Sequence, residues 1–222
     1  MFGLYRCCAL VLIFSLFSGG LLLASTAMPP LPPPLVSRMA ATYGPEAATR
    51  LMQWQQLLLQ QHETREWHQL HHINVFMNKV PFKSDAEHWG LNDYWATPAE
   101  FLSSNGGDCE DFAIAKLFSL HASKVNPTKL RLMYVNATTL NQPHIVLVYK
   151  EGPGEPLFVL DNLTDQILPT DQRPDLEPIY SFNMSGLWLT SRQGLGQQVR
   201  NHSGSTLWED LITRIGREGF NI

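Results

Sequence analysis

The residue whose surroundings point most directly to chemistry is Cys109. It lies in the segment GGDCED (residues 106–111), and apolar residues that recur at helical spacing predict a helix starting at Asp108. At the start of a helix, free amide hydrogens and the helix dipole favour a thiolate, which is the attacking form of cysteine. The same amides can bind the oxyanion that forms when a carbonyl is attacked. We therefore interpret Cys109 as a nucleophile, because its polar neighbours make no apolar pocket for an inert thiol.

A partner for this thiolate is expected among the histidines, because the neighbouring acids Glu110 and Asp111 repel a negative charge. His144 differs from the others because it heads the apolar run IVLV, which predicts a strand. Asp161 closes the next predicted strand, after FVL. The three residues then form a Cys-His-Asp triad, in which the acid orients the imidazole.

The distance between His144 and Asp161 depends on the hairpin that joins their strands. If Tyr149 pairs with Pro156 across the turn, His144 lies directly opposite Asp161, on the same face of the sheet. A slip of one residue would place the two side chains on opposite faces. This register was chosen because it unites the triad.

The amino-terminal residues resemble an export signal. Arg6 precedes an almost entirely apolar run, residues 7–24, and the small residues 25–27 follow. This pattern predicts a secretory signal peptide at residues 1–27, with an uncleaved membrane anchor as the alternative. Since Cys7 and Cys8 lie in this segment, the exported chain carries Cys109 alone and forms no internal disulfide.

The remaining elements indicate an α+β fold, with amino-terminal helices packed on an antiparallel sheet. Residues 28–44 form a Pro-rich leader, in which residues 29–34 are expected to be an extended spacer, and residues 45–222 form one domain. Within it we expect a helical part (45–125), a sheet part (128–192) and a terminal helix (205–218). Thr97 and Glu100 predict a capping box for a short helix. Strands are predicted at residues 130–135, 144–149, 157–161, 179–182 and 187–190.

Composition excludes several classes of protein. The chain has 222 residues, of which 44% are hydrophobic, so it can build a core and is not disordered. Its formal net charge of −4 provides no basic surface, which argues against nucleic acid as a partner. The three histidines at positions 68, 71 and 72 lack the Cys or carboxylate pattern that would complete a metal site.

Three segments carry a family resemblance: NDYWATPAEFL, GGDCEDFAIAK, and PHIVLVY followed by FVLDN. They are similar to the bacterial transglutaminase-like cysteine proteinases of the LapG type, over roughly residues 67–191. The resemblance implies a transglutaminase-like, papain-like fold and a periplasmic protease with Cys109, His144 and Asp161 as its triad. It also implies calcium as a cofactor, with Asp108, Glu110 and Asp111 as candidate ligands of the kind that calcium prefers.

The resemblance further implies a substrate and a regulator. Such proteases cut a large cell-surface adhesin near its amino terminus, beside paired alanines, and release it during biofilm dispersal. An inner-membrane receptor for cyclic di-GMP sequesters them, and the protease itself binds no nucleotide. Trp89 and Trp95 are candidates for an indole N–H at the oxyanion, with core packing as the alternative. Amide transfer or amidase action through the same triad, and a non-catalytic binding module, remain the rival functions.

Overall fold

The computed structural model describes residues 30–61, 64–191 and 194–219. The signal peptide predicted at residues 1–27 lies outside this part of the chain. The helices are α1 (Pro33–Tyr43), α2 (Pro45–Gln61), α3 (Glu66–Met77), α4 (Asp85–His88), α5 (Pro98–Ser104), α6 (Cys109–Ala122) and α7 (Thr206–Arg217). Across the described residues, no helix combines the length and the apolar character that crossing a membrane would require.

One antiparallel sheet of seven strands has the order β4-β3-β2-β1-β5-β6-β7. Its strands are β1 (Leu130–Ala137), β2 (Gln142–Lys150), β3 (Leu157–Leu160), β4 (Leu168–Pro169), β5 (Leu176–Asn183), β6 (Gly186–Ser191) and β7 (Gly194–Arg200). Short 3-10 helices at Pro127–Lys129 and Thr170–Gln172 precede β1 and follow β4. The predicted α+β fold is confirmed, with β4 and β7 as strands that the sequence pattern did not reveal.

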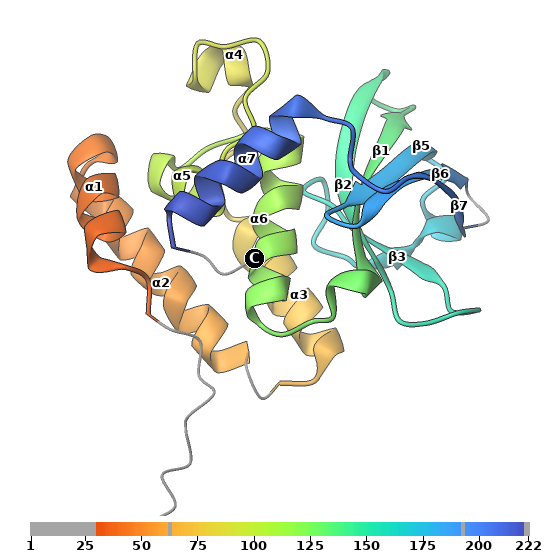
Figure 1. The fold of residues 1–222 in the computed structure, drawn as a ribbon, viewed down its shortest axis with the longest axis horizontal. Coiled ribbons are helices and arrows are strands. Elements are labelled where there is room, and N and C mark those ends of the chain that lie inside the picture. The colour runs from red at the N-terminus through yellow and green to blue at the C-terminus, as the bar shows by residue number, and fades with distance from the viewer. Residues whose placement is uncertain (1–29, 62–63, 192–193, 220–222) are drawn as a thin grey trace, which may run out of the picture.

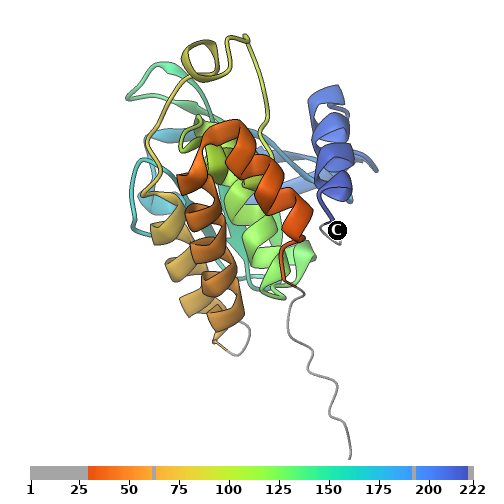
Figure 2. The same ribbon diagram turned by 90° about the vertical axis from the view of Figure 1, so that its left-hand side faces the viewer.

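Helix α6 lies between the sheet and helices α1 and α2, and α7 lies to one side of this stack (Figures 1 and 2). The apolar side of the sheet that faces α6 forms one core with the helices, including Leu132, Leu147 and Phe182. A second, smaller apolar cluster, which includes Val135, Val146 and Val159, lies on the other face. Alternation along each strand explains this division, because successive side chains point to opposite faces.

The extended spacer predicted at residues 29–34 is corrected at its end, because a helix already begins at Pro33. Residues Pro33–Tyr43 form α1, in which Leu35 and Met39 are buried in the main core. The first turn of a helix tolerates proline because its amide hydrogens have no partner within the helix. The prolines therefore start this helix, and the apolar residues that follow them at helical spacing pack it against α2.

The register of the β2–β3 hairpin differs from the prediction by two residues. Lys150 pairs with Leu157 and Leu147 with Leu160, so Tyr149 does not pair with Pro156. Proline has no amide hydrogen to donate to a ladder, and the strand accordingly begins after Pro156. A shift of two residues keeps each side chain on its predicted face. His144 and Asp161 therefore remain neighbours, displaced along the strands.

Candidate active site

Cys109 is the first residue of α6, and Asp111 holds the turn that precedes it. The carboxylate of Asp111 accepts hydrogen bonds from the backbone N–H of Ala96 at 2.7 Å and of Asp108 at 3.3 Å. A Cβ atom at Gly107 would collide with this carboxylate and with the ring of Phe101. The glycine therefore permits the close approach that brings the chain into α6, as expected for a residue that needs no side-chain space.

The thiol of Cys109 lies against the strand that carries His144. Its sulfur is in hydrogen-bond contact with the backbone N–H of Ile145, the residue after His144 in β2. The thiol also lies 3.1 Å from Oε2 of Glu110, to which it can donate. Burial, followed by the charge of Glu110, raises the pKa of Cys109. The thiol proton is therefore harder to remove than in a solvent-exposed cysteine.

His144, next to Ile145 in β2, and Asp161, which follows β3, form a buried pair. Nε2 of His144 lies 2.9 Å from Oδ1 of Asp161, and the two residues are 2% and 1% exposed. No hydrogen bond among the described residues uses the other ring nitrogen, Nδ1. One nitrogen of the imidazole is thus fixed by the acid, and the other remains for proton transfer.

Arg173 completes this arrangement, although no sequence pattern indicated it. Its Nη2 donates to Oδ2 of Asp161 at 2.6 Å, and the same guanidinium binds Asp175 through Nη2 at 2.7 Å and Nε at 2.9 Å. Burial alone would raise the pKa of Asp161, but the hydrogen bonds from His144 and Arg173 lower it to about 2. The acid is therefore ionised throughout the neutral range.

The backbone around Asp161 is held by Asn78, which follows α3. Its amide Nδ2 lies within hydrogen-bond distance of the carbonyls of Asp161 (2.9 Å) and Thr164 (3.1 Å) and of Oδ1 of Asp165 (2.9 Å). Asn74, one helical turn earlier, donates to the carbonyl of Asp165 at 3.1 Å. The sequence assigned both asparagines to a helix but gave no sign of this contact, because the partners lie more than 80 residues away.

Five carboxylates gather beside the catalytic cysteine, and two of them come from outside the predicted motif. Asp85, Asp93 and Glu110 form one group whose oxygens lie within 4.8 Å of one another, and Asp85, Asp108 and Asp111 form another. Burial, with the charge of Glu110, raises the pKa of Asp108 to about 9. Crowded carboxylates of this kind are stable when a cation neutralises them.

The donor set fits calcium. Oδ1 of Asp85 and Oδ1 of Asp108 are buried and have no hydrogen-bond partner among the described residues. Such orphaned oxygens require compensation, and calcium takes six to eight oxygen ligands in a flexible geometry. Asp111 contributes less, since both of its oxygens already accept backbone hydrogen bonds.

The two candidate tryptophans have different surroundings. Trp95 packs in the core, stacked on Phe182 with ring centroids 5.9 Å apart and edge-on to Trp208 at 6.5 Å. These contacts fit the alternative of core packing, and a role for Trp95 at the oxyanion stays a prediction. The ring of Trp89 contacts Tyr43 and Tyr94, and its buried Nε1 has no partner among the described residues. A role for Trp89 at the oxyanion stays a prediction.

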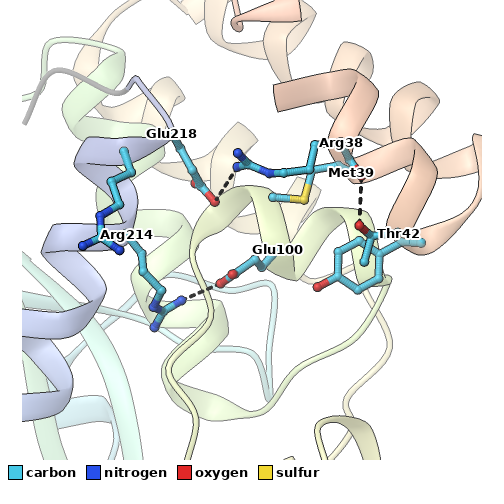
Figure 3. A pocket seen from close by; sticks show the side chains of 8 residues that line it. Arg38, Met39, Thr42, Glu100, Arg214 and Glu218 are labelled. Atoms are coloured by element: carbon cyan, nitrogen blue, oxygen red, sulfur yellow. Dashed lines mark hydrogen bonds and ion pairs between the residues drawn. The ribbon is translucent and has the colours of Figure 1, made fainter. Parts of the chain in front are cut away.

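A separate cavity of about 330 Å³ lies between α1, α5 and α7, and no triad residue lines it. Figure 3 shows Glu218 and Arg38 facing each other there, with their charged groups 4.0 Å apart, and Arg214 paired with Glu100. Glu218 accepts a hydrogen bond from Thr97 at 2.9 Å. Burial raises the pKa of Glu218 to about 7. The ion pairs that line this cavity connect α7 and the residue after it to α1 and α5.

A family model described as bacterial transglutaminase-like cysteine proteinase matches residues 46–177, which include Cys109, His144 and Asp161. The chain belongs to this family. As a member, it is a cysteine proteinase. A search of the curated proteins found no match.

Solved structures agree with this family membership. Calcium-bound LapG of Legionella pneumophila is 36% identical, with a TM-score of 0.70 over 81% of this chain and 97% of that chain. EGTA-treated LapG of the same organism is 35% identical, with a TM-score of 0.71 over 81% and 95% of the two chains. The family and the fold therefore agree with the geometry of the site.

Proposed function

We propose that this cysteine proteinase is an endopeptidase in which Cys109 attacks, His144 transfers the proton and Asp161 orients the imidazole. One observation carries the proposal: the buried His144–Asp161 pair, held by Arg173, flanks the β2 residue whose backbone contacts the Cys109 sulfur. This arrangement provides the base-and-orienter pair that nucleophilic catalysis needs.

The reaction begins when His144 accepts the proton of Cys109 and the thiolate attacks the peptide carbonyl carbon. The amides at the start of α6 are placed to stabilise the oxyanion. When the carbon–nitrogen bond breaks, His144 returns its proton to the leaving amine and a thioester remains. Water then loses a proton to His144 and attacks the thioester, which releases the acid and restores the thiol.

The proposed substrate is the amino-terminal region of a large cell-surface adhesin, cut beside paired alanines. Release of the adhesin would promote biofilm dispersal. The proposed location is the periplasm, after export by the signal at residues 1–27. The proposed regulator is an inner-membrane receptor that senses cyclic di-GMP and sequesters the protease. The resemblance of the segments around Cys109 and His144 to LapG-type proteases supports these assignments.

Calcium is the proposed cofactor, held by Asp108 and Glu110 together with Asp85 and Asp93. The orphaned oxygens of Asp85 and Asp108 support this assignment, as does the calcium-bound state of the Legionella protein. Calcium supplies positive charge that offsets the carboxylates around the nucleophile. Asp111 supports the same loop through its backbone hydrogen bonds, and no bond-breaking step requires the ion.

The test is to incubate the purified protein with an amino-terminal adhesin fragment that contains paired alanines, and to map the products by mass spectrometry. We expect one cut beside the alanines, which excess chelator abolishes and added calcium restores. The Cys109→Ala variant is the control. Including a primary amine distinguishes hydrolysis from transfer, because a transglutaminase would yield amine-linked product. Absence of any cut in the presence of calcium would reject the proposal.

A further inference from the structure

The geometry points to a substrate-binding platform that runs across the sheet from the active site and consists of Tyr134, Tyr180 and Leu189. We infer that this platform binds apolar side chains of the polypeptide about three to four residues from the scissile bond. The inference rests on the proposed function, because it takes the polypeptide substrate as the occupant.

The platform begins at the residue that contacts the nucleophile. Ile145, whose backbone N–H contacts the Cys109 sulfur, pairs with Tyr134 in β1. Tyr134 pairs with Tyr180 in β5, and Tyr180 pairs with Leu189 in β6. Side chains of directly paired residues lie on the same face of a sheet. The four residues therefore form one continuous row that starts beside Cys109.

The row lies on the side of the sheet that faces the helices, immediately beyond the area they cover. Phe182, two residues after Tyr180, packs edge-on against Trp208 of α7 with ring centroids 5.5 Å apart. Tyr134 and Tyr180 are only half-buried, and Leu189 is 58% exposed. The helical layer therefore covers the start of the row at Ile145 and leaves the outer end at Leu189 open to a ligand.

The two tyrosines form a flat, rigid surface. Their rings stack with centroids 5.1 Å apart and an angle of 3° between the planes. Neither hydroxyl takes part in a hydrogen bond among the described residues. Aromatic rings of this kind provide large contact areas at low entropic cost, and their hydroxyls can donate to peptide carbonyls. The surface suits an extended chain with apolar side chains.

Distance along the row determines which substrate residues it contacts. Neighbouring strands lie about 4.8 Å apart, so Tyr180 and Leu189 are roughly 10 and 14 Å from the β2 strand. An extended polypeptide advances about 3.3 Å for each residue. A chain whose carbonyl lies at Cys109 and that leaves across β1 thus places its third and fourth residues over Tyr180 and Leu189.

The proposed occupant is the substrate because the row is continuous with the catalytic cysteine. A polypeptide that extends from the Cys109 sulfur across β1 follows this row, which starts at Ile145, the residue whose backbone contacts that sulfur. An unrelated docking partner on the same surface would compete with the substrate for Ile145 and Tyr134. The platform therefore selects among polypeptide substrates by binding their apolar side chains.

The test measures peptide binding to the Cys109→Ala variant, so that binding is observed without cleavage. Three fluorescent peptides share a paired-alanine centre. One carries leucine at the third and fourth positions before the bond, one carries it at those positions after the bond, and one has serine at all these positions. By fluorescence anisotropy, we expect one leucine peptide to bind about tenfold more tightly than the serine peptide.

When Leu189→Ser is added to the Cys109→Ala variant, most of the preference for the leucine peptide should disappear. Adding Met52→Ser should leave this preference unchanged. Met52 is the matched control because it is 56% exposed, close to the 58% of Leu189, and lies on α2, away from the sheet. Tyr180→Phe, which keeps the ring, should retain the preference. Circular dichroism of each variant verifies that the fold is intact.

Equal affinity for all three peptides, or a preference that survives Leu189→Ser, would overturn the inference. Cleavage of the adhesin fragment by the wild type is scored separately. If the wild type cuts the fragment and no peptide preference exists, the platform fails while the protease assignment stands. If a leucine preference depends on Leu189 but the fragment is never cut, the platform stands and the proposed function fails.

Discussion

Nε2 of His144 lies 2.9 Å from Oδ1 of Asp161, although the two residues are displaced along neighbouring strands and do not face each other directly. The register that pairs Leu147 with Leu160 places Asp161 just beyond the end of β3, within reach of the first part of β2. Arg173 holds the opposite oxygen of the same carboxylate. Both carboxylate oxygens of Asp161 are therefore held in place, one by His144 and the other by Arg173.

Replacing the nucleophile tests the triad directly. Cys109→Ala should reduce cleavage of the adhesin fragment at least about 1000-fold, because no other group at the site can form the thioester. The free energy of unfolding should change little, since the substitution removes only the sulfur atom of a half-buried side chain. Cleavage is measured by gel densitometry and stability by urea denaturation. Substantial activity in a folded Cys109→Ala protein would reject the triad.

His144→Ala should be as damaging as the cysteine change, because residues that act as one unit lose activity non-additively. Asp161→Asn should also be severe but retain more activity, since it alters the orientation of the base and leaves the base in place. Steady-state rates of the single and double variants measure this. A His144→Ala/Asp161→Asn rate equal to the product of the two single losses would contradict the coupled arrangement.

Arg173 should act as a positioning residue through Asp161. Its hydrogen bond helps lower the pKa of Asp161 to about 2, so the native state gains stability above the ordinary aspartate pKa and loses it as pH falls through about 2. In Arg173→Met the pKa of Asp161 should rise, and stability and activity should both decline at a higher pH than in the wild type. Melting temperature and kcat/KM measured from pH 3 to 8 would show this.

Two variants serve as controls for Arg173. Arg173→Lys keeps the charge but loses the planar fork, so it should restore part of the acid tolerance. Arg65→Met removes an exposed arginine at the start of α3 and should leave the pH profile unchanged. A profile for Arg173→Met that coincides with the wild type would show that the arginine only contributes packing.

The carboxylates outside the predicted motif provide a test of calcium binding. Asp85→Asn and Asp93→Asn should each weaken calcium about tenfold or more, because each removes a charged oxygen ligand. Isothermal titration calorimetry measures this affinity without reference to activity. Asp171→Asn, at an exposed position in the 3-10 helix after β4, is the control and should bind normally. Unchanged affinity in both variants would remove these two residues from the site.

Glu218 should make stability depend on pH near neutrality. Its pKa is raised from 4.5 to about 7, so the folded state favours the protonated form. The resulting stabilisation is fully present below the unfolded value and is lost as pH rises through about 7. Glu218→Gln should therefore melt at a higher temperature than the wild type at pH 8, and the difference should shrink at pH 5. Equal melting temperatures at pH 8 would contradict the burial of an ionising acid.

Local patterns in the sequence were sufficient for much of the fold and for the helix start that carries Cys109. The capping box of Thr97 and Glu100 is present, and α6 begins within one residue of its predicted start. The terminal helix and the strands β1, β2 and β3 also lie close to their predicted ranges. These features depend on neighbours within a few residues, so their physical cause is visible in the sequence itself.

The sequence also predicted that His144 and Asp161 would meet, but through a register that the structure corrects. The prediction of their proximity survived because the actual register differs by two residues, and a shift of two leaves every side chain on its face. The prediction of an extended spacer in the Pro-rich leader was wrong at Pro33 and Pro34 for a related reason. Prolines predict an extended segment locally, and only the packing of Leu35 and Met39 against the other helices reveals the first turn of α1.

The sequence by itself determined that Cys109 starts a helix between acidic residues, that His144 lies in a strand and that Asp161 ends the next one, while their catalytic roles stay predictions. Only the tertiary structure decided that Arg173 holds Asp161, that Asp85 and Asp93 join the carboxylates, and that Tyr134 lies beside Tyr180. These contacts join residues from 12 to 46 positions apart. Chain folding brings such residues together through sheet register and helix packing, and no pattern within a short window records either one.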